Sequence, residues 1–467
     1  MTTSDLFRLT ARAAVDLLKR GEVSPLEMVE AALARIAATE PAIHALPTLA
    51  AERARAAAKR VDRASLLAGL PFAVKDLDDV AGVRTTQGSP IYADHVAPRS
   101  DIMVERLEAA GGIVLAKSNT PEFGAGANTY NQLFPETTTP WNTRLTAGGS
   151  SGGSAAALAV GQVWLATGSD LGGSLRTPAS YCGVVGLRPS PGRVAAGPSE
   201  FAFDTLPVCG PMARNVGDTA LMLDAMVGQH DEDPLSLEVP REPFLSAVGR
   251  ARLPRRVAYS SDLGICPVTP AVRQVASAAM ARLAAEGVIV EEATPDLRDA
   301  QEIFRVLRAV GFAARRKPDY DAHRDLLNPE VIWNTELGLS LDSETIGRAE
   351  RARGRLYHRV LAFMKNYDLL LVPAASLPPF DVKTRWIRSL EGETFDNYVE
   401  WIRITYALSL TSLPILCIPC GMTAEGLPIG LQLVGRPRGE AALLQAGAAL
   451  EELFGLAGQL PIDPRAG

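Results

Sequence analysis

Two glycine-rich segments hold serines in surroundings that suit acyl transfer. Residues 148–154 read GGSSGGS, and residues 169–176 read SDLGGSLR. A nucleophilic hydroxyl needs open space, and a developing oxyanion needs backbone N–H donors that no bulky side chain covers; glycine provides both. Each segment by itself is also compatible with a flexible loop or a phosphate-binding nest. Together they indicate a hydrolytic site with a serine nucleophile.

A lysine at the end of an apolar stretch adds a candidate base. Residues 70–76 read LPFAVKD, which is typical of a short buried strand with Lys75 at its end. An amine acts as a base only when neutral, and the reference pKa of lysine is about 10.4. Burial among apolar side chains disfavours the ammonium form and lowers this pKa. The alternative is a surface lysine paired with Asp76 or Asp78.

In these three elements and their spacing, the chain resembles the amidase signature family. Lys75 precedes Ser150 by 75 residues, and Ser150 precedes Ser174 by 24. Further segments match motifs of the family: KSNTPEFG at 117–124, PWN at 140–142, CGVVGLRP at 182–189 and GLPIGLQ at 426–432. The resemblance extends over nearly the whole chain, is densest between residues 70 and 215, and implies an amidase.

The resemblance implies a role for each of the three polar residues. Ser174 is the expected nucleophile, Ser150 the bridging hydroxyl and Lys75 the terminal base, and the peptide bond between Gly149 and Ser150 is expected to be cis. Lys75 then accepts a proton during acylation and returns it to the departing amine. The expected reaction is hydrolysis of a carboxylic amide to an acid and ammonia or an amine, through an acyl-enzyme on Ser174.

The loop that carries Ser174 is expected to hold the oxyanion. The expected donors are the backbone N–H groups of Leu171, Gly172, Gly173 and Ser174. Four residues are expected to keep the two serine loops in shape, namely Ser151, Asp170, Arg176 and Thr177. Asp170 and Arg176 are expected to form an ion pair.

The substrate pocket is expected between residues 123–134 and 378–406. The residues expected to contact substrate are Gly124, Gly149, Trp386, Arg388, Tyr398 and Trp401. Because Arg385, Arg388 and Arg403 lie among these aromatic residues, one hypothesis is a hydrophobic or aryl acyl group with a carboxylate that an arginine pairs with. The alternative is that the aromatic side chains pack the domain surface. The motifs do not select among amide, ester, urea and lactam substrates.

Within the family, the main alternative is the amidase-type subunit of tRNA-dependent glutamine amidotransferase, which works with partner proteins. That protein holds glutamine with an acidic residue ahead of its C-terminal GLP segment. Counted back from Pro414, Ile402 occupies this place here, and Glu400 is nearby. We therefore expect a stand-alone amidase.

The glycine-rich loops also suggest two other classes of protein, an α/β-hydrolase esterase and a nucleotide-binding module. Residues 149–153 satisfy the GxSxG pattern of α/β-hydrolase esterases, but that pattern needs a strand leading into the serine, and residues 141–146 do not read as a strand. Those esterases also need a histidine late in the chain, whereas the last histidine here is His358. A nucleotide-binding module is disfavoured because the sequence contains no GxxxxGK[ST] motif.

Composition limits the partners and the compartment. The 467 residues carry a formal net charge of −6 and no long basic run, which argues against a general nucleic-acid binder. Residues 1–5 are polar and no apolar run is long enough for a membrane span, so we expect a cytoplasmic protein that binds no membrane. The histidines and cysteines show no metal-ligand spacing and no disulfide framework, and we expect Cys417 and Cys420 in a buried strand. We expect no metal or cofactor and a small-molecule amide as substrate; a homodimer is implied only by the resemblance.

Alternating elements predict an α/β fold. Ser24, Pro25 and Glu27 are typical of a capped helix start, and Ser100 is expected to cap a helix that ends near Ala110. Strands are predicted at 71–75, 113–117, 163–167, 257–260, 288–292, 369–373 and 413–419. The resemblance implies a single large domain with a mixed central β-sheet of about a dozen strands, covered by helices on both faces. We expect its parts to be an N-terminal helical part (1–65), a signature core (66–230), a variable helical insert (231–380) and a C-terminal part of the core (381–467).

Overall fold

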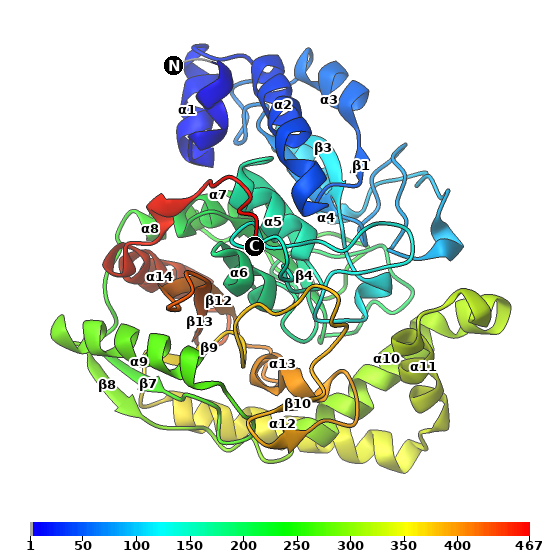
Figure 1. The fold of residues 1–467 in the computed structure, drawn as a ribbon, viewed down its shortest axis with the longest axis vertical. Helices are drawn as coiled ribbons and strands as arrows, with labels where there is room; N and C mark the ends of the chain where they lie inside the picture. Colours follow the sequence, from blue (N-terminus) through cyan, green and yellow to red (C-terminus); the bar gives the residue numbers. More distant parts are fainter. Residues whose placement is uncertain (1–2) are drawn as a thin grey trace.

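Eleven strands form one mixed β-sheet in the computed structural model, which describes residues 3–467 (Figure 1). Residues 1 and 2, part of the polar segment considered for a secretory signal, lie outside this range. The strands are β1 (Thr48–Leu49), β2 (Pro71–Lys75), β3 (Ile113–Ser118), β4 (Leu165–Asp170), β5 (Val185–Arg188), β6 (Val208–Ala213), β7 (Arg256–Tyr259), β8 (Ile289–Glu292), β9 (Leu369–Pro373), β12 (Ile415–Met422) and β13 (Pro428–Val434). Two short strands, β10 (Ser389–Leu390) and β11 (Glu393–Thr394), form a separate ribbon.

The order of strands in the large sheet is β1-β3-β2-β4-β6-β5-β12-β13-β9-β7-β8. β2 runs parallel to β3 and β4, and β7 runs parallel to β8 and β9. The other neighbours are antiparallel. The prediction of a mixed sheet of about a dozen strands is therefore confirmed.

Helices cover the sheet on both faces, as predicted (Figure 1). They are α1 (Ala11–Arg20), α2 (Pro25–Ile43), α3 (Ala51–Ala58), α4 (Ile102–Ala109), α5 (Gly152–Val160), α6 (Arg176–Cys182), α7 (Val216–Met226), α8 (Phe244–Val248), α9 (Pro270–Ala285), α10 (Ala300–His323), α11 (Pro329–Ser340), α12 (Ser343–Met364), α13 (Arg403–Ser409) and α14 (Glu440–Phe454). Helix α5 packs against α6 and strands β2, β3, β4 and β6, whereas α7 packs against α8, α14 and β6. Helices α10, α11 and α12 form a layer of their own along one side of the molecule.

Local sequence explains where these helices begin. The Ser24 hydroxyl accepts from the Glu27 N–H, and the Glu27 carboxylate accepts from the Ser24 N–H, so the predicted capping box at the start of α2 is present. The predicted cap of α4 is wrong by one residue. Asp101 occupies the N-cap position, because the Ser100 hydroxyl accepts instead from the backbone N–H of Ala81 in a neighbouring loop.

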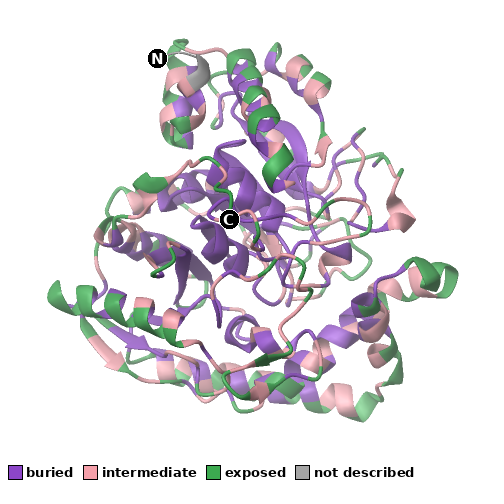
Figure 2. Cartoon of the chain, in the orientation of Figure 1, coloured by how far each residue is buried: buried purple, intermediate pink, exposed green. Residues whose placement is uncertain are grey.

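One apolar core joins all parts of the chain. The largest cluster of buried hydrophobic side chains extends from Leu6 near the N-terminus to Phe454 in the last helix. The inner strands of the sheet and helices α5 and α6 are buried almost throughout, while the edge strands β1 and β8 are partly exposed and the outer helices each keep an exposed face (Figure 2). Cys417 and Cys420 are buried in β12, as predicted. A continuous core of this kind is that of a single domain.

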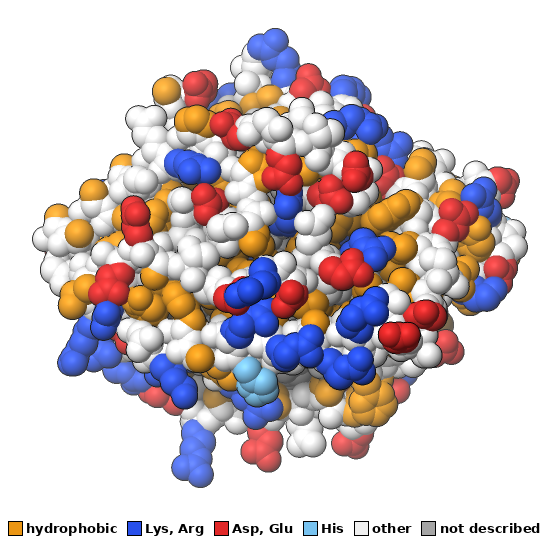
Figure 3. Space-filling view, turned by 90° about the horizontal axis from the view of Figure 1, so that it is seen from below, with side chains coloured by type: hydrophobic (Ala, Val, Ile, Leu, Met, Phe, Trp, Pro, Cys, Tyr) orange, Lys and Arg blue, Asp and Glu red, His pale blue; other side chains and the backbone are white. Residues whose placement is uncertain are grey.

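The surface carries charges of both signs. Seen from the side of α12, Lys and Arg side chains lie across the molecule with Asp and Glu side chains between them (Figure 3). Many of these charges are paired, as in the ion pairs Arg298–Asp296 and Arg305–Glu302. Within residues 3–467, no helix combines the length and the apolar character needed to cross a bilayer.

Candidate active site

The carboxyl ends of β2 and β4 bring the predicted base together with three serine hydroxyls. The two strands are parallel neighbours, so both end at the same edge of the sheet. Lys75 is the last residue of β2, and its Nζ lies 2.7 Å from Ser150 Oγ, 2.9 Å from Ser151 Oγ and 3.0 Å from Ser169 Oγ. Sequence reasoning assigned no role to Ser169; its place near the end of a strand, five residues before Ser174, was the available signal.

Burial changes the protonation of Lys75. Its side chain has no exposed surface, and this burial lowers the pKa of the amine to about 8, although the nearby carboxylate of Asp78 opposes the shift. The surface pairing of Lys75 with Asp76 is not found, because Asp76 lies 3.2 Å from the buried Lys117. Burial likewise raises the pKa of Asp78 to about 6. An amine with a pKa near neutrality is suited to exchange protons during a reaction.

The two loop serines meet at one cavity. Ser150 and Ser174 both line it, and the peptide bond between Gly149 and Ser150 is cis, as the resemblance implied. The backbone N–H of Ser151 donates to the carbonyl oxygen of Ser174 at 3.3 Å, which ties the two loops together. In the described part of the chain the hydroxyls of Ser150 and Ser174 make no hydrogen bond to each other. The structure therefore links Lys75 to Ser150 directly and brings Ser174 to the same cavity.

A buried ion-pair network shapes the loop that carries Ser174. The Asp170 carboxylate accepts from Arg176 Nε and Nη2 at 2.9 Å each, which is the predicted ion pair, and Arg188 Nη1 lies 3.3 Å away. All three side chains are fully buried. Burial by itself raises the pKa of Asp170, but the two guanidinium groups outweigh it and hold the pKa well below its usual range. The carboxylate therefore stays charged and fixes the loop.

The donors predicted for the oxyanion divide into two groups. The N–H of Gly173 donates to Asp170 Oδ1 at 2.9 Å, so its inclusion among the oxyanion donors is corrected. The N–H groups of Leu171, Gly172 and Ser174 donate no hydrogen bond to any described residue. Of these three residues, Leu171 and Ser174 line the cavity.

Contacts with neighbouring residues explain why three positions of the site are glycines and how one threonine supports the serine loop. Gly173 has φ of +126°, and a Cβ there would lie 2.4 Å from the hydroxyl oxygen of Thr405. A Cβ on Gly149 would lie 2.7 Å from the backbone of Asn128, so this glycine serves packing and is not a wall of the cavity. Gly124 does line the cavity, where a Cβ would lie 3.4 Å from Ser150 Oγ. The backbone N–H of Thr177 donates to the carbonyl of Gly173 at 2.8 Å.

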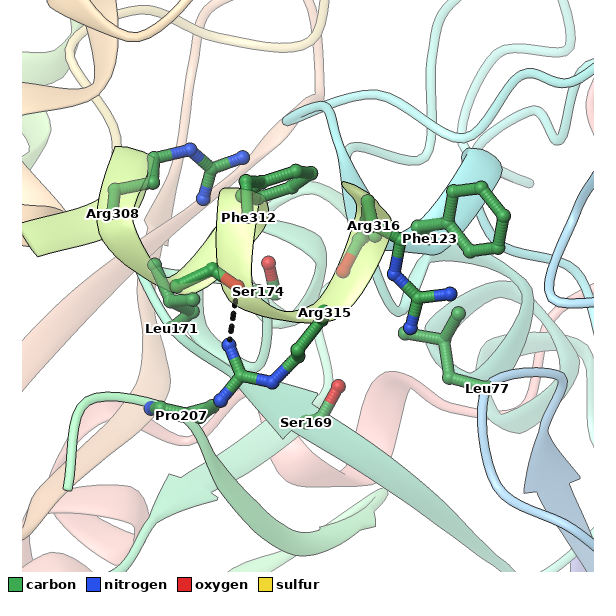
Figure 4. A pocket seen from close by; sticks show the side chains of 13 residues that line it. Leu77, Phe123, Ser169, Leu171, Ser174, Pro207, Arg308, Phe312, Arg315 and Arg316 are labelled. Carbon is green, nitrogen blue, oxygen red and sulfur yellow. Dashed lines mark hydrogen bonds between the residues drawn. The ribbon is translucent and has the colours of Figure 1, made fainter. Parts of the chain in front are cut away.

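Helix α10 forms one wall of the cavity. Arg308, Phe312, Arg315 and Arg316 project from this helix around it, and Leu171 and Ser174 belong to the serine loop (Figure 4). The thirteen lining residues are Leu77, Phe123, Gly124, Ser150, Ser169, Leu171, Ser174, Pro207, Arg308, Gly311, Phe312, Arg315 and Arg316. Segment 123–134 thus contributes to the wall, as expected.

Segment 378–406 contributes no residue to this lining. The prediction that four residues of this segment line the substrate cavity is therefore corrected for Trp386, Arg388, Tyr398 and Trp401. Trp401 is buried in an apolar cluster outside the cavity, and Arg388 lies over the ring of Trp386. Tyr398 lies behind α10, where its hydroxyl accepts from Arg308 Nη2 at 2.7 Å. These side chains support the wall or pack among themselves, and none of them lines the cavity.

The arginines predicted to meet a substrate carboxylate have protein partners. Arg385 Nη2 lies 2.7 Å from the Glu330 carboxylate, and Arg403 pairs with Glu393. The arginines that line the cavity come from α10 and were missed. Helical spacing places residues 308, 312, 315 and 316 on one face of a helix, but it does not indicate that this face meets the serines.

The fold and the sequence of this chain match those of amide hydrolases. Residues 27–444 match the family model described as Amidase, and the chain belongs to the amidase signature family. It is 34% identical over 473 residues to an acylamidase from Rhodococcus erythropolis, with 99% of each chain covered. It is also 35% identical to a glutamyl-tRNA(Gln) amidotransferase subunit from Moorella thermoacetica, over 96% of this chain and 97% of that relative. The solved structure of a bacterial aryl acylamidase of the amidase signature family superimposes with a TM-score of 0.87 at 26% identity, covering 97% of this chain and 99% of the other.

Proposed function

We propose that the enzyme hydrolyses a carboxylic amide through an acyl-enzyme on Ser174, with Ser150 and Lys75 carrying the proton. The observation that carries this proposal is the 2.7 Å contact between Lys75 Nζ and Ser150 Oγ in a fully buried setting. Burial lowers the pKa of Lys75 to about 8, so a substantial fraction of the amine is neutral near physiological pH. A neutral amine is the base that the serine hydroxyls require.

The proton count around Lys75 fits a relay. A lysine ammonium has three N–H donors, and three serine oxygens lie within 3.0 Å of Nζ. The neutral amine has only two N–H groups and one lone pair, so one hydroxyl must donate to nitrogen. Ser150 and Ser169 both border the cavity, and of these two it is Ser150 that stands in the loop tied to Ser174. It can donate to Lys75 while it accepts from Ser174.

The proposed steps balance in atoms and charge. Ser174 Oγ forms a bond to the amide carbonyl carbon, its proton moves to Ser150 Oγ, and the Ser150 proton moves to Lys75 Nζ. The oxyanion accepts from the free N–H groups of Leu171, Gly172 and Ser174. The C–N bond then breaks as the departing nitrogen takes the proton back along the same path. Water repeats the sequence on the ester and releases the acid.

The lining of the cavity favours a stand-alone amidase over a glutamine-binding component of a larger assembly. None of the thirteen lining residues is Asp or Glu, so this lining itself offers no carboxylate to the α-ammonium of glutamine. Glu400, the nearby acidic candidate, accepts from the Asp396 N–H and from Asn397 Nδ2 at 2.9 Å each, outside the lining. Ile402 lies outside it as well. We therefore propose that the chain acts on simple amides without partner proteins.

An esterase of the α/β-hydrolase type has less support. The segment before Ser150 is irregular apart from isolated bridges at Leu145 and Thr146, so no strand leads into the serine. None of the lining residues is a histidine. The proton therefore has Lys75 as its available acceptor.

The test is to trap the acyl-enzyme on the purified chain alone. Acid quenching during turnover of a small amide, followed by peptide mass spectrometry, is expected to show the acyl group on Ser174. Ser174→Ala and Lys75→Ala are expected to abolish both the adduct and turnover, whereas His44→Ala and His358→Ala keep them. Ser154→Ala is the matched serine control, because Ser154 bonds to Ser118 and to the Thr167 carbonyl and not to Lys75. An adduct on another residue, or ammonia released only from glutamine in the presence of partner proteins, would refute the proposal.

A further inference from the structure

Arg308 is a buried cation without a carboxylate partner. Its side chain lies on α10 and lines the cavity that contains Ser174, and the residue is 7% exposed. Nε donates to Asn334 Oδ1 at 3.2 Å and Nη2 donates to the Tyr398 hydroxyl at 2.7 Å, and both of these partners are uncharged. Among residues 3–467 no carboxylate lies within ion-pair distance of Arg308, and Nη1 has no hydrogen-bond partner.

The two neighbouring arginines of the cavity differ from Arg308 in this respect. Arg315 Nη2 lies 2.5 Å from the Asp204 carboxylate, and Arg316 Nη1 lies 3.1 Å from the Asp319 carboxylate. Their charges are therefore neutralised within the protein. Of these three arginines, Arg308 is the one whose positive charge no described carboxylate balances, so it is available to a ligand in the cavity.

The surroundings of Arg308 hold its guanidinium in place. Its Cζ lies 4.7 Å from the centre of the Phe312 ring and 5.6 Å from that of Tyr398. Asn334 Nδ2 also donates to the Tyr398 hydroxyl at 2.5 Å, so the two polar partners of Arg308 are bonded to each other. An arginine keeps its charge in a protein, and a buried charge is costly unless an opposite charge meets it. A positioned guanidinium of this kind suits a carboxylate that arrives with a ligand.

We propose that Arg308 binds a carboxylate on the acyl part of the substrate, so that the enzyme prefers amides whose acyl group carries a negative charge. This inference rests on the proposed function, since it names the substrate class of the same site. The lining also contains apolar side chains, among them Leu171, Pro207 and Phe312, and the last of these lies against the Arg308 guanidinium. We therefore expect the acyl group to be apolar apart from its carboxylate.

The size of the cavity limits that acyl group. Its volume is about 160 Å³, close to the roughly 150 Å³ of an engineered cavity that holds one benzene molecule. The part of the substrate held in this cavity is therefore a single ring or a short chain, while an adjoining pocket, which shares Leu77, Ser169, Pro207, Arg315 and Arg316 with it, extends the space beyond. The substrate class is the monoamide of a short dicarboxylic acid or of a carboxylated single-ring acid.

The first test measures binding without turnover. In Ser174→Ala, isothermal titration calorimetry compares 4-carboxybenzamide with 4-acetylbenzamide, a neutral probe of similar shape. We expect the carboxylated probe to bind about 10- to 100-fold more tightly, because a hydrogen bond to a charged partner contributes on this scale. Adding Arg308→Met is expected to remove the difference while the affinity for 4-acetylbenzamide stays the same, which also shows that the cavity is intact.

Arg385→Met is the matched control, because Arg385 pairs with Glu330 and lies outside the lining. It is expected to keep the preference, and Arg308→Lys, which keeps the charge but loses the planar fork, is expected to keep part of it. Equal affinity for the two probes, no binding of 4-carboxybenzamide at millimolar concentration, or a preference that survives Arg308→Met would overturn the inference. If the inference fails in one of these ways, an acyl adduct on Ser174 of the wild-type enzyme, formed from 4-acetylbenzamide, would leave the proposed function standing. If no amide forms that adduct, the proposed function and the inference about Arg308 both fail.

Discussion

Lys75 on β2 and Ser169 on the adjacent parallel strand β4 lie side by side, with 3.0 Å between Nζ and Oγ. Ser169 also lines the cavity, but it stands on the sheet and not in the loop that begins at Ser150. Its hydroxyl accepts from the Lys75 amine beside those of Ser150 and Ser151. In the proposed mechanism Ser150 moves the proton, and we expect Ser169 to help to hold it on nitrogen.

Replacing Ser169 separates these tasks experimentally. We expect Ser169→Ala to remain active and to shift the acidic limb of the pH profile of kcat/KM to lower pH, because the ammonium loses one of its acceptors and the pKa of Lys75 falls. Ser150→Ala, which removes the bridging hydroxyl, is expected to be inactive across the whole range. An acidic limb that stays in place or moves upward in Ser169→Ala would contradict this assignment.

The pH dependence of the unmodified enzyme follows from the buried amine. Burial lowers the pKa of Lys75 to about 8, and only the neutral amine is a base, so kcat/KM is expected to rise with pH through a limb near pH 8. The Asp78 carboxylate favours the ammonium form and so raises this pKa. Asp78→Asn is expected to move the limb to lower pH. A profile that is flat from pH 6 to 9 in the wild type would argue against Lys75 as the base, and Glu242→Gln at an exposed ion pair serves as the control for a remote charge.

The base and the serine loops could be predicted from the sequence because each is a local pattern. The strand Pro71–Lys75 is a short apolar run, and the serines stand in glycine loops whose spacing to Lys75 matches a known family. The ion pair of Asp170 with Arg176 could also be predicted, since the two residues are only six positions apart in the sequence.

The far wall of the cavity could not be predicted in the same way. Arg308 stands in a charged helix more than 130 residues after Ser174, and nothing local indicates that this helix crosses the serine loop. The aromatic cluster around Trp386 and Trp401 gave a misleading signal, because its side chains pack together outside the cavity. Only the tertiary arrangement distinguishes an aromatic residue that packs a domain from one that meets a ligand.

Gly173 is expected to be indispensable for activity. Its φ of +126° is unfavourable for other residues, and a Cβ would lie 2.4 Å from the Thr405 hydroxyl oxygen, so Gly173→Ala must displace the loop that offers the oxyanion donors. We expect kcat to fall by about 10²-fold or more, the loss typical of a missing oxyanion donor. Gly458→Ala is the control, because a Cβ there meets no atom within 4 Å. Steady-state kinetics on one amide compare the two variants, and wild-type kcat in Gly173→Ala would show that the loop tolerates the change.

Asp170 is expected to be needed for stability as well as for the shape of the serine loop. In Asp170→Asn the fully buried guanidinium groups of Arg176 and Arg188 lose the carboxylate that they share, and an uncompensated buried charge costs about 3–5 kcal/mol. Urea unfolding at pH 7 measures the change in the free energy of unfolding. Glu242→Gln removes the carboxylate of the exposed pair with Arg250 and is expected to leave the unfolding midpoint unchanged. Because the asparagine is nearly isosteric, a loss below about 1 kcal/mol would mean that hydrogen bonds to uncharged oxygens, such as those of Arg176 to Gln432 and to the Thr405 carbonyl, stabilise the buried guanidinium groups without the carboxylate.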